Sequence, residues 1–173
     1  MKQGLSVIKG PYFEGARDRI VHSRNIIRDK VLAGGYDYFF SLEQDVIPEK
    51  NVIEQLLKHN MQIVSGVVYN NLPVGNEIKL MPMVYVAHPK DPTGLWYANE
   101  SELRKSRLME AKACGLSCVL IHKSVLETIK FRHAQGFDDM MFCKDAIEQG
   151  FKIYADPSVR PRHLNSTWIG VQK

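Results

Sequence analysis

The sequence has few cysteines and no long hydrophobic run. Its 173 residues include Cys114, Cys118 and Cys143, and no Cys-x-x-Cys pair. An odd count without that spacing argues against both a disulfide framework and a zinc knuckle, so we expect buried free thiols. No apolar stretch approaches the length of a membrane-spanning helix, and no secretory signal opens the sequence. These absences predict a cytoplasmic protein without a transmembrane segment.

The sequence also lacks a strong excess of charge. Its 23 Lys and Arg against 19 Asp and Glu give a formal net charge of +4. This balance suits a small polyanion such as a nucleotide diphosphate and is too weak to predict nucleic acid as a partner. With 45% hydrophobic residues, residues 1–173 are expected to form a single globular domain. A homo-oligomer is compatible with the sequence, which does not specify the oligomeric state.

The most informative stretch runs from Tyr36 to Pro48. An apolar and aromatic segment predicts a buried strand, and two carboxylates, Glu43 and Asp45, follow where that strand should end. Ligands bind at the carboxyl ends of strands in open α/β sheets, and two acids so close together repel unless a cation or strong donors share the site. A divalent metal with a phosphorylated ligand explains the pattern. An ordinary strand end with solvated acids would show the same pattern.

Around this stretch, apolar segments with strand character alternate with segments of helical periodicity. Strands are expected at 5–8, 36–42, 61–69, 79–88, 112–121 and 151–155, and helices at 15–32, 48–60, 124–129 and 137–149. Residues 89–99 read as an ordered loop, and residues 100–109 as a weakly helical or mobile segment that could serve as a lid. The alternation predicts an α/β fold with a mostly parallel central sheet flanked by helices.

Several motifs then resemble one family in their order and spacing. Arg24-Asn25, the strand ending in Glu43-Gln44-Asp45, and residues 63–66 resemble the nucleotide-sugar half of GT-A-fold glycosyltransferases, the family 2-like nucleotide-diphospho-sugar transferases. Residues 115–121, Asp138-Asp139 and His163 are similar to the acceptor strand, acidic pair and late histidine of these enzymes, and Gly150 to their helix-ending glycine. The resemblance covers the sequence from about Arg17 onward. It implies a GT-A-like fold and a hexosyltransferase activity.

The resemblance also implies a set of site residues. The donor, a nucleotide-diphosphate sugar, is expected to contact Arg17, Arg24, Asn25, Glu43, Gln44 and Gly115. Arginines this dense also occur on ordinary solvated helix faces. Asp45 and His163 would bind Mn²⁺ or Mg²⁺, which stabilises the charge of the leaving phosphate. A tail histidine without a ligand role remains an alternative.

The acidic pair supplies the expected catalytic groups. Asp139 is the expected base toward an acceptor hydroxyl, and Asp138 would position that acceptor. A carboxylate pair at a helix start is also common as helix capping. A base at Asp139 implies inversion at the anomeric carbon, although retaining enzymes share the fold. The acceptor, whether glycan, lipid or protein, is not specified.

Two departures from the family pattern matter. Glu43 stands where an aspartate is usual, so direct metal contact by this residue is not expected. Only about fifteen residues precede the arginine-rich helix, so residues 5–8 correspond to the family's second strand. The pocket for the nucleotide base is then incomplete, completed by a partner, or lost.

Two other functions stay open: a sugar- or protein-binding module without catalysis, and a nucleotidyltransferase. The nucleotidyltransferase predicts a glycine-rich basic loop after the first strand, which the sequence lacks.

Overall fold

The computed structural model describes residues 6–164. The helices are α1 (Ala16–Ala33), α2 (Val52–Leu57), α3 (Glu100–Lys105), α4 (Lys123–Thr128) and α5 (Asp138–Glu148). The strands are β1 (Tyr38–Leu42), β2 (Val46–Ile47), β3 (Ile63–Gly66), β4 (Tyr69–Val74), β5 (Glu77–Pro82), β6 (Val84–His88), β7 (Asp91–Tyr97), β8 (Met109–Ala111), β9 (Ala113–Cys114), β10 (Cys118–His122), β11 (Ile153–Asp156) and β12 (Arg162–His163). None of these helices is long and apolar enough to cross a bilayer.

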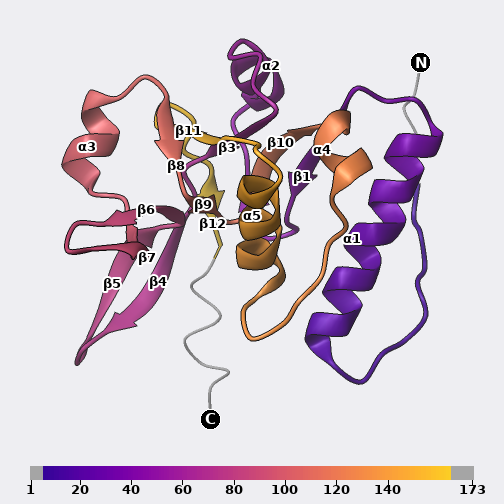
Figure 1. Cartoon of the computed structure of the whole chain (residues 1–173), viewed down its shortest axis with the longest axis horizontal. Coiled ribbons are helices and arrows are strands. Elements are labelled where there is room, and N and C mark those ends of the chain that lie inside the picture. Colours follow the sequence, from indigo (N-terminus) through magenta and orange to yellow (C-terminus); the bar gives the residue numbers. More distant parts are fainter. Residues whose placement is uncertain (1–5, 165–173) are drawn as a thin grey trace.

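The central sheet has the order β1-β10-β3-β11-β8 (Figure 1). Its pairings are antiparallel except that of β11 with β3, so the prediction of a mostly parallel sheet is wrong. The reason is β10, which inserts antiparallel between β1 and β3, with Leu120 opposite Phe40 on one side and Val64 on the other. The alternation of strand and helix along the sequence made β1 and β3 look like parallel neighbours. They do run in the same direction, but they do not touch.

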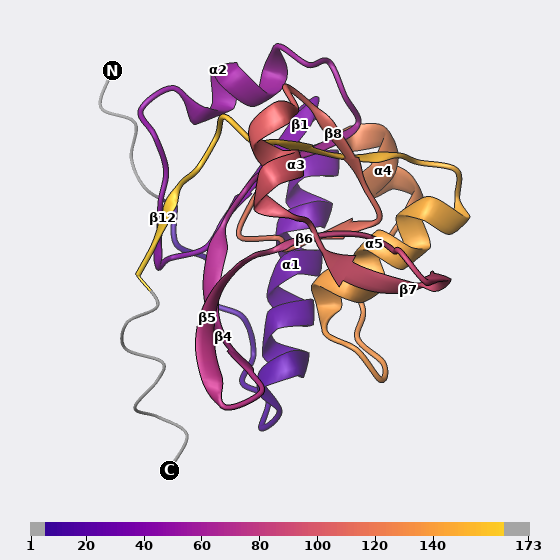
Figure 2. The same ribbon diagram turned by 90° about the vertical axis from the view of Figure 1, so that its left-hand side faces the viewer.

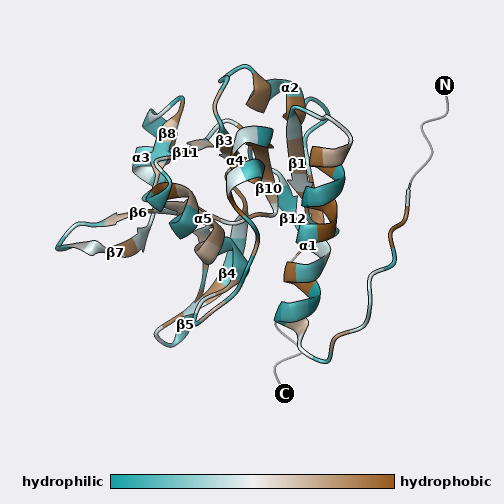
Figure 3. Cartoon of the chain, turned by 45° about the vertical axis from the view of Figure 1, so that its right-hand side comes forward, coloured by the Kyte–Doolittle hydropathy of each residue, from teal (hydrophilic) through white to brown (hydrophobic). Residues whose placement is uncertain are grey.

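Both faces of this sheet are covered, because β3 is buried at every position and β10 at every position but its last. Side chains alternate between faces along a strand. Ile63 accordingly packs in one core cluster with Leu126 of α4 and Phe142 of α5, whereas Val64 packs in another with Leu56 of α2. Figure 3 shows the hydrophobic positions as brown segments along β1 and β10. The cysteines predicted to be buried free thiols are buried and free.

Two hairpins extend from one side of the sheet, on the left of Figure 1. β4 and β5 form a two-stranded ribbon closed by Gly75 and Asn76, with φ of 63° at Gly75. A positive φ at the first turn residue matches the natural twist of a hairpin. β6 and β7 form a second hairpin, whose strand β6 also pairs with β9. Figure 2 shows the β4–β5 ribbon curling away from the body, with β12 and α5 on opposite sides of the molecule.

Several local predictions differ from the structure. Residues 89–99, expected as a loop, contain β7. This strand lies at the edge of its sheet, where a proline such as Pro92 is tolerated because it need not donate a hydrogen bond to a neighbouring strand. The pairing of β7 with β6 is also irregular between Ala87 and His88. The expected helix at 48–60 is only the short α2, and the expected strand at 79–88 breaks at Met83 into β5 and β6. Residues 100–109 hold α3 and the start of β8. Leu5 lies outside the described residues, and 6–8 form no strand.

Candidate functional site

A cavity of about 750 Å³ opens at the end of the sheet where β1 and β3 finish and β10 begins. Its walls come from the turn after β1, the start of β4, the turn before β10, the start of α5, and β12. Charged residues from distant parts of the sequence gather there. They are Arg24, Glu43, Asp45, Asp138, Asp139 and His163. The cavity has the volume of a pocket for a small organic ligand.

Asp45 and His163 form a pair on one wall. β12 pairs antiparallel with β2, which puts His163 opposite Val46, and the backbone N–H of Leu164 donates to the Asp45 carbonyl over 2.7 Å. The His163 Nε2 atom then lies 3.3 Å from Asp45 Oδ2. The other ring nitrogen, Nδ1, lies 3.2 Å from the carbonyl oxygen of Tyr69.

These contacts restrict what can lie between the two side chains. A carbonyl oxygen only accepts hydrogen bonds, so Nδ1 must carry a proton. In the neutral ring Nε2 would therefore point a lone pair at a carboxylate oxygen, which is unfavourable. Either a second proton or a cation relieves this contact. Backbone contact at one ring nitrogen is the usual arrangement for a histidine whose other nitrogen binds a metal.

Arg24 connects the end of β1 to the start of α5. Its Nη2 atom is 2.9 Å from Glu43 Oε1, and its Nε atom is 2.6 Å from Asp138 Oδ2. Nη1 donates to the Ser41 hydroxyl over 3.1 Å, and that hydroxyl donates to the Leu116 carbonyl over 2.7 Å. The side chains of Arg24 and Asp138 are only 13% and 12% exposed. One guanidinium thus offsets two of the four carboxylates and orders three segments of the wall.

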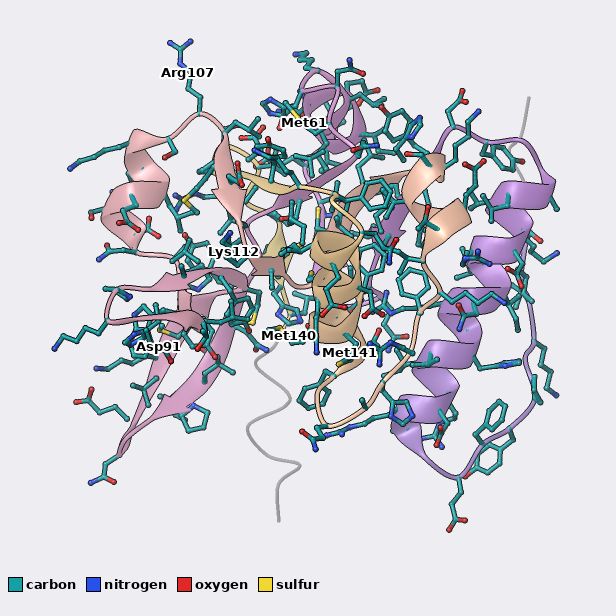
Figure 4. The ribbon with its side chains drawn as sticks, viewed as in Figure 1. Met61, Asp91, Arg107, Lys112, Met140 and Met141 are labelled. Atoms are coloured by element: carbon teal, nitrogen blue, oxygen red, sulfur yellow. The ribbon has the colours of Figure 1, made fainter. Side chains whose placement is uncertain are left out.

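Asp139 lies next to this ion pair, in the first turn of α5, and Met140 and Met141 in Figure 4 directly follow it. Burial raises its pKa above the usual value, and the nearby Asp138 carboxylate adds to the rise. The Met140 N–H, which donates to Asp139 Oδ1 over 2.7 Å, and the charge of Arg24 oppose it. A helix N-terminus lowers the pKa of a carboxylate, but burial outweighs that effect at Asp139. A raised pKa makes the carboxylate a better base.

The remaining predicted donor residues lie in different settings. Gly115 lines the cavity, and a Cβ there would come 3.3 Å from Cβ of Met83, so the close backbone approach favours glycine. Arg17 is outside the wall, but its guanidinium carbon lies 4.5 Å from the ring centroid of Phe137, which is part of the wall. Gln44 is exposed and does not line the cavity.

Two residues of the basic helix are structural anchors. The Asn25 side chain donates to the Phe131 carbonyl over 2.8 Å and accepts from the Phe131 N–H over 3.0 Å. The buried Arg28 donates through Nε to the carbonyls of Leu126 and Ile129 at the end of α4. Of Arg17, Arg24 and Arg28 on this helix, Arg24 is the one that lines the cavity.

Among the wall residues that the sequence interpretation missed, three bring amide or aromatic groups to the cavity. Asn70 and Asn71 at the start of β4 bring amide groups to the cavity, and Phe137 brings an aromatic ring. An Asn-Asn pair before Pro73 and Gly75 reads equally well as turn chemistry, so no local signal separated the two roles.

Comparison with known proteins gives a structural similarity and no family. No family model matches the sequence, and no curated protein matches it. Among solved structures, the fold is similar to the crystal structure of A197 from STIV, with a TM-score of 0.55 and 24% sequence identity. The match covers 83% of this chain and 66% of A197, slightly less than two thirds of that protein's length.

These findings correct the resemblance drawn from sequence motifs. Assignment to the family 2-like GT-A glycosyltransferases is wrong, because no family model supports it and the similarity to A197 extends to the fold alone. The sheet of mostly antiparallel strands disagrees with the same assignment. Any function for the cavity must therefore be argued from its own residues.

Proposed function

We propose that this chain is a glycosyltransferase, which moves a sugar from a nucleotide-diphosphate donor to an acceptor hydroxyl with the help of Mn²⁺ or Mg²⁺. One observation carries the proposal. A carboxylate with a raised pKa, Asp139, and an acid–histidine pair suited to a cation, Asp45 and His163, line the same cavity although they come from three separate segments.

Asp139 would act on the acceptor. Its carboxylate takes the proton of an acceptor hydroxyl while the hydroxyl oxygen attacks the anomeric carbon of the donor. The bond from that carbon to the phosphate oxygen breaks, and its electron pair leaves with the nucleotide diphosphate. Attack opposite to the departing phosphate inverts the anomeric carbon. Asp138, held 2.6 Å from Arg24, is placed beside Asp139 to orient the acceptor.

Asp45 and His163 fit a divalent cation in part. Neighbouring ligands of an octahedral ion at about 2.1 Å lie roughly 3 Å apart, close to the 3.3 Å between Asp45 Oδ2 and His163 Nε2. Within residues 6–164, no cluster of three or more His, Cys, Asp or Glu suits a metal. Mg²⁺ and Mn²⁺ tolerate so few protein ligands where substrate phosphates and water complete the shell. A bound cation would stabilise the negative charge on the departing diphosphate.

The test is donor turnover. The purified chain is incubated with a panel of nucleotide-diphosphate sugars, with Mn²⁺ or with chelator, and the release of free nucleotide is measured. We expect cation-dependent release from at least one donor, and its loss in Asp139→Asn when an acceptor is present. Glu148→Gln, at the exposed far end of α5, is the matched control and should retain the wild-type rate. No release from any donor would reject the proposal.

A second function, donor or glycan binding without transfer, is favoured by the state of Arg24. This guanidinium is already paired with Glu43 and Asp138, so it offers less positive charge to a diphosphate. A chain that only binds would give thermal stabilisation by a nucleotide sugar with no nucleotide release. Transfer remains the better-supported function, because a binding module has no need of a carboxylate with a raised pKa.

A further inference from the structure

A second cavity, also of about 750 Å³, lies on the other side of the β4–β5 ribbon. It is enclosed by that ribbon, by the β6–β7 hairpin and by α3, the group of elements on the left of Figure 1. Its wall includes Tyr69, Leu80, Trp96, Glu100 and Arg160. The site proposed above does not use these side chains.

The polar part of this wall is organised around Glu100. Its Oε1 atom accepts from Arg160 Nη1 over 2.8 Å and from Arg104 Nε over 3.0 Å. Its Oε2 atom accepts from the Tyr69 hydroxyl over 2.5 Å. The hydrogen bond from Tyr69, followed by that from Arg160, lowers the Glu100 pKa to about 2. Two carboxylate oxygens offer about four acceptor positions, so this fixed group can still accept from a ligand hydroxyl.

The charges of the wall balance one another. Glu100 and Glu102 are matched by Arg104 and Arg160. A polyanion or a polycation would gain no net attraction here. The wall instead offers both acceptors and donors. Arg160 donates through Nε to the Pro157 carbonyl and through Nη1 to Glu100, and the Nη2 group of the same guanidinium can donate to a ligand. This mixture suits a neutral ligand rich in hydroxyl groups, because each hydroxyl both donates and accepts.

The apolar part of the wall presents an aromatic surface. Trp96 is 54% exposed, which is unusual for the largest side chain in a folded chain. Its ring meets His88 edge-on at a centroid distance of 5.3 Å, which limits its motion. The face of an aromatic ring is negative and attracts the weakly positive C–H groups on the flat side of a sugar ring.

Tyr69 connects the two cavities. Its hydroxyl donates to Glu100 in the second cavity, while its carbonyl lies 3.2 Å from His163 Nδ1 in the first. A molecule bound against Glu100 and Trp96 is thus one residue away from the Asp45–His163 pair.

From the fixed carboxylate, the balanced charge and the exposed indole, we propose that the second cavity binds a neutral oligosaccharide. Its placement as the non-reacting end of an acceptor glycan, with the reacting hydroxyl near Asp139, rests on the function proposed above. The binding site itself does not. If both proposals hold, the acceptor is a neutral glycan rather than a lipid or a protein.

The test measures binding without donor or cation. The chain is titrated with cello-, chito-, malto- and manno-oligosaccharides, and the indole N–H signal of Trp96 is followed by NMR and assigned with Trp96→Ala. We expect at least one of these sugars to shift that signal. Trp96→Ala, whose affinity is measured by calorimetry because it lacks the indole, should bind that sugar at least tenfold more weakly. Glu100→Gln should also weaken binding, as a second variant that keeps the shape of the wall. Leu95→Ala is the matched control, because Leu95 is exposed on the same strand but does not line the cavity.

Three results would overturn the inference. The first is the absence of a Trp96 shift with every oligosaccharide at millimolar concentration. The second is equal affinity in wild type, Trp96→Ala and Glu100→Gln. The third is a stronger response to a peptide of similar length, or to pyrophosphate, than to any sugar. Nucleotide release with no sugar binding would reject this inference alone, and sugar binding with no nucleotide release would reject only the transfer reaction.

Discussion

The replacement of Arg24 by methionine tests whether one guanidinium holds the site together. Methionine keeps much of the side-chain volume and removes the charge. The change leaves Asp138 and Glu43 without their partner, beside Asp139 and Asp45 in the same cavity. Four carboxylates would then face one another with no cation fixed between them.

The expected cost follows from the exposure of each partner. Breaking a buried ion pair by removing one side costs about 3–5 kcal/mol, and the 12–13% exposed pair of Arg24 and Asp138 belongs near the lower end, at about 3 kcal/mol. The Glu43 side chain is 43% exposed, so its pair adds at most about 1 kcal/mol. The two pairs together therefore contribute about 3–4 kcal/mol. For a chain of 173 residues, each kcal/mol moves the melting temperature by about 2–4 °C, so a loss of roughly 6–16 °C is expected.

Thermal and urea unfolding at neutral pH measure this loss. Arg107→Met is the control, because Arg107 extends into open space beyond α3 in Figure 4, and its replacement should change stability by less than about 0.5 kcal/mol. Arg24→Met combined with Asp138→Asn should recover part of the stability, because the second change removes the charge left unpaired. A melting temperature within 2 °C of wild type for Arg24→Met, set against an expected loss of about 6–16 °C, would refute this reasoning. The reasoning would also be refuted if the stability losses of Arg24→Met and Asp138→Asn simply added in the double variant.

Three further predictions concern the acids and the histidine of the two cavities. Asp139→Asn should lower transfer at least a hundredfold with donor binding unchanged. The wild-type rate should fall on acidification through a pKa above 3.8, because the base must be ionised. The control Glu148→Gln should keep both the wild-type rate and the wild-type pH–rate profile, and the same result for Asp139→Asn would contradict its role as the base. Asp45→Asn and His163→Ala should each remove the Mn²⁺-dependent part of the thermal stabilisation given by a nucleotide diphosphate, and retention of that part in both would exclude the pair as ligands. Glu100 should stabilise the fold above pH 4.5, where its unfolded-state carboxyl is ionised, and lose this contribution as the pH falls toward 2; unfolding measured from pH 5 to pH 2.5 should be less pH-dependent in Glu100→Gln than in wild type.

The elements that the sequence predicts well are those with strong local signals. α1 was expected from Gly15 to Leu32 and spans Ala16–Ala33, ending at the glycine pair that follows it. α5 was expected from residue 137 and begins one residue later, at Asp138, and its expected stop, Gly150, has a φ of 85°, a conformation that favours glycine. Helix periodicity and glycine stops act within a few residues, so they can be read without knowing the fold.

Strand pairing cannot be read in the same way. The strand expected at 112–121 is interrupted by the turn at 115–117, and β10 begins only at Cys118. Nothing within these residues says that β10 pairs with both β1 and β3. A strand buried on both sides reads as a continuous apolar run in a parallel or an antiparallel sheet. β7 shows the opposite difficulty, because proline and glycine look like loop signals at an edge where strands tolerate them.

β10, the strand whose pairing the sequence did not predict, is also the strand that brings the site together. Because β10 runs antiparallel to β1 and β3, the turn that enters it lies at the edge where both of those strands end. The carbonyl of Ser117 in that turn accepts from the N–H of Glu43 over 3.1 Å, and the carbonyl of Leu116 accepts from the hydroxyl of Ser41. Arg24 binds the same hydroxyl, so the guanidinium is oriented by a turn about ninety residues away in sequence. A parallel strand in this place would enter from the opposite edge and leave the acids of the β1 turn without these contacts. The acidic residues are local features of the sequence, but the cavity that collects them depends on a long-range pairing.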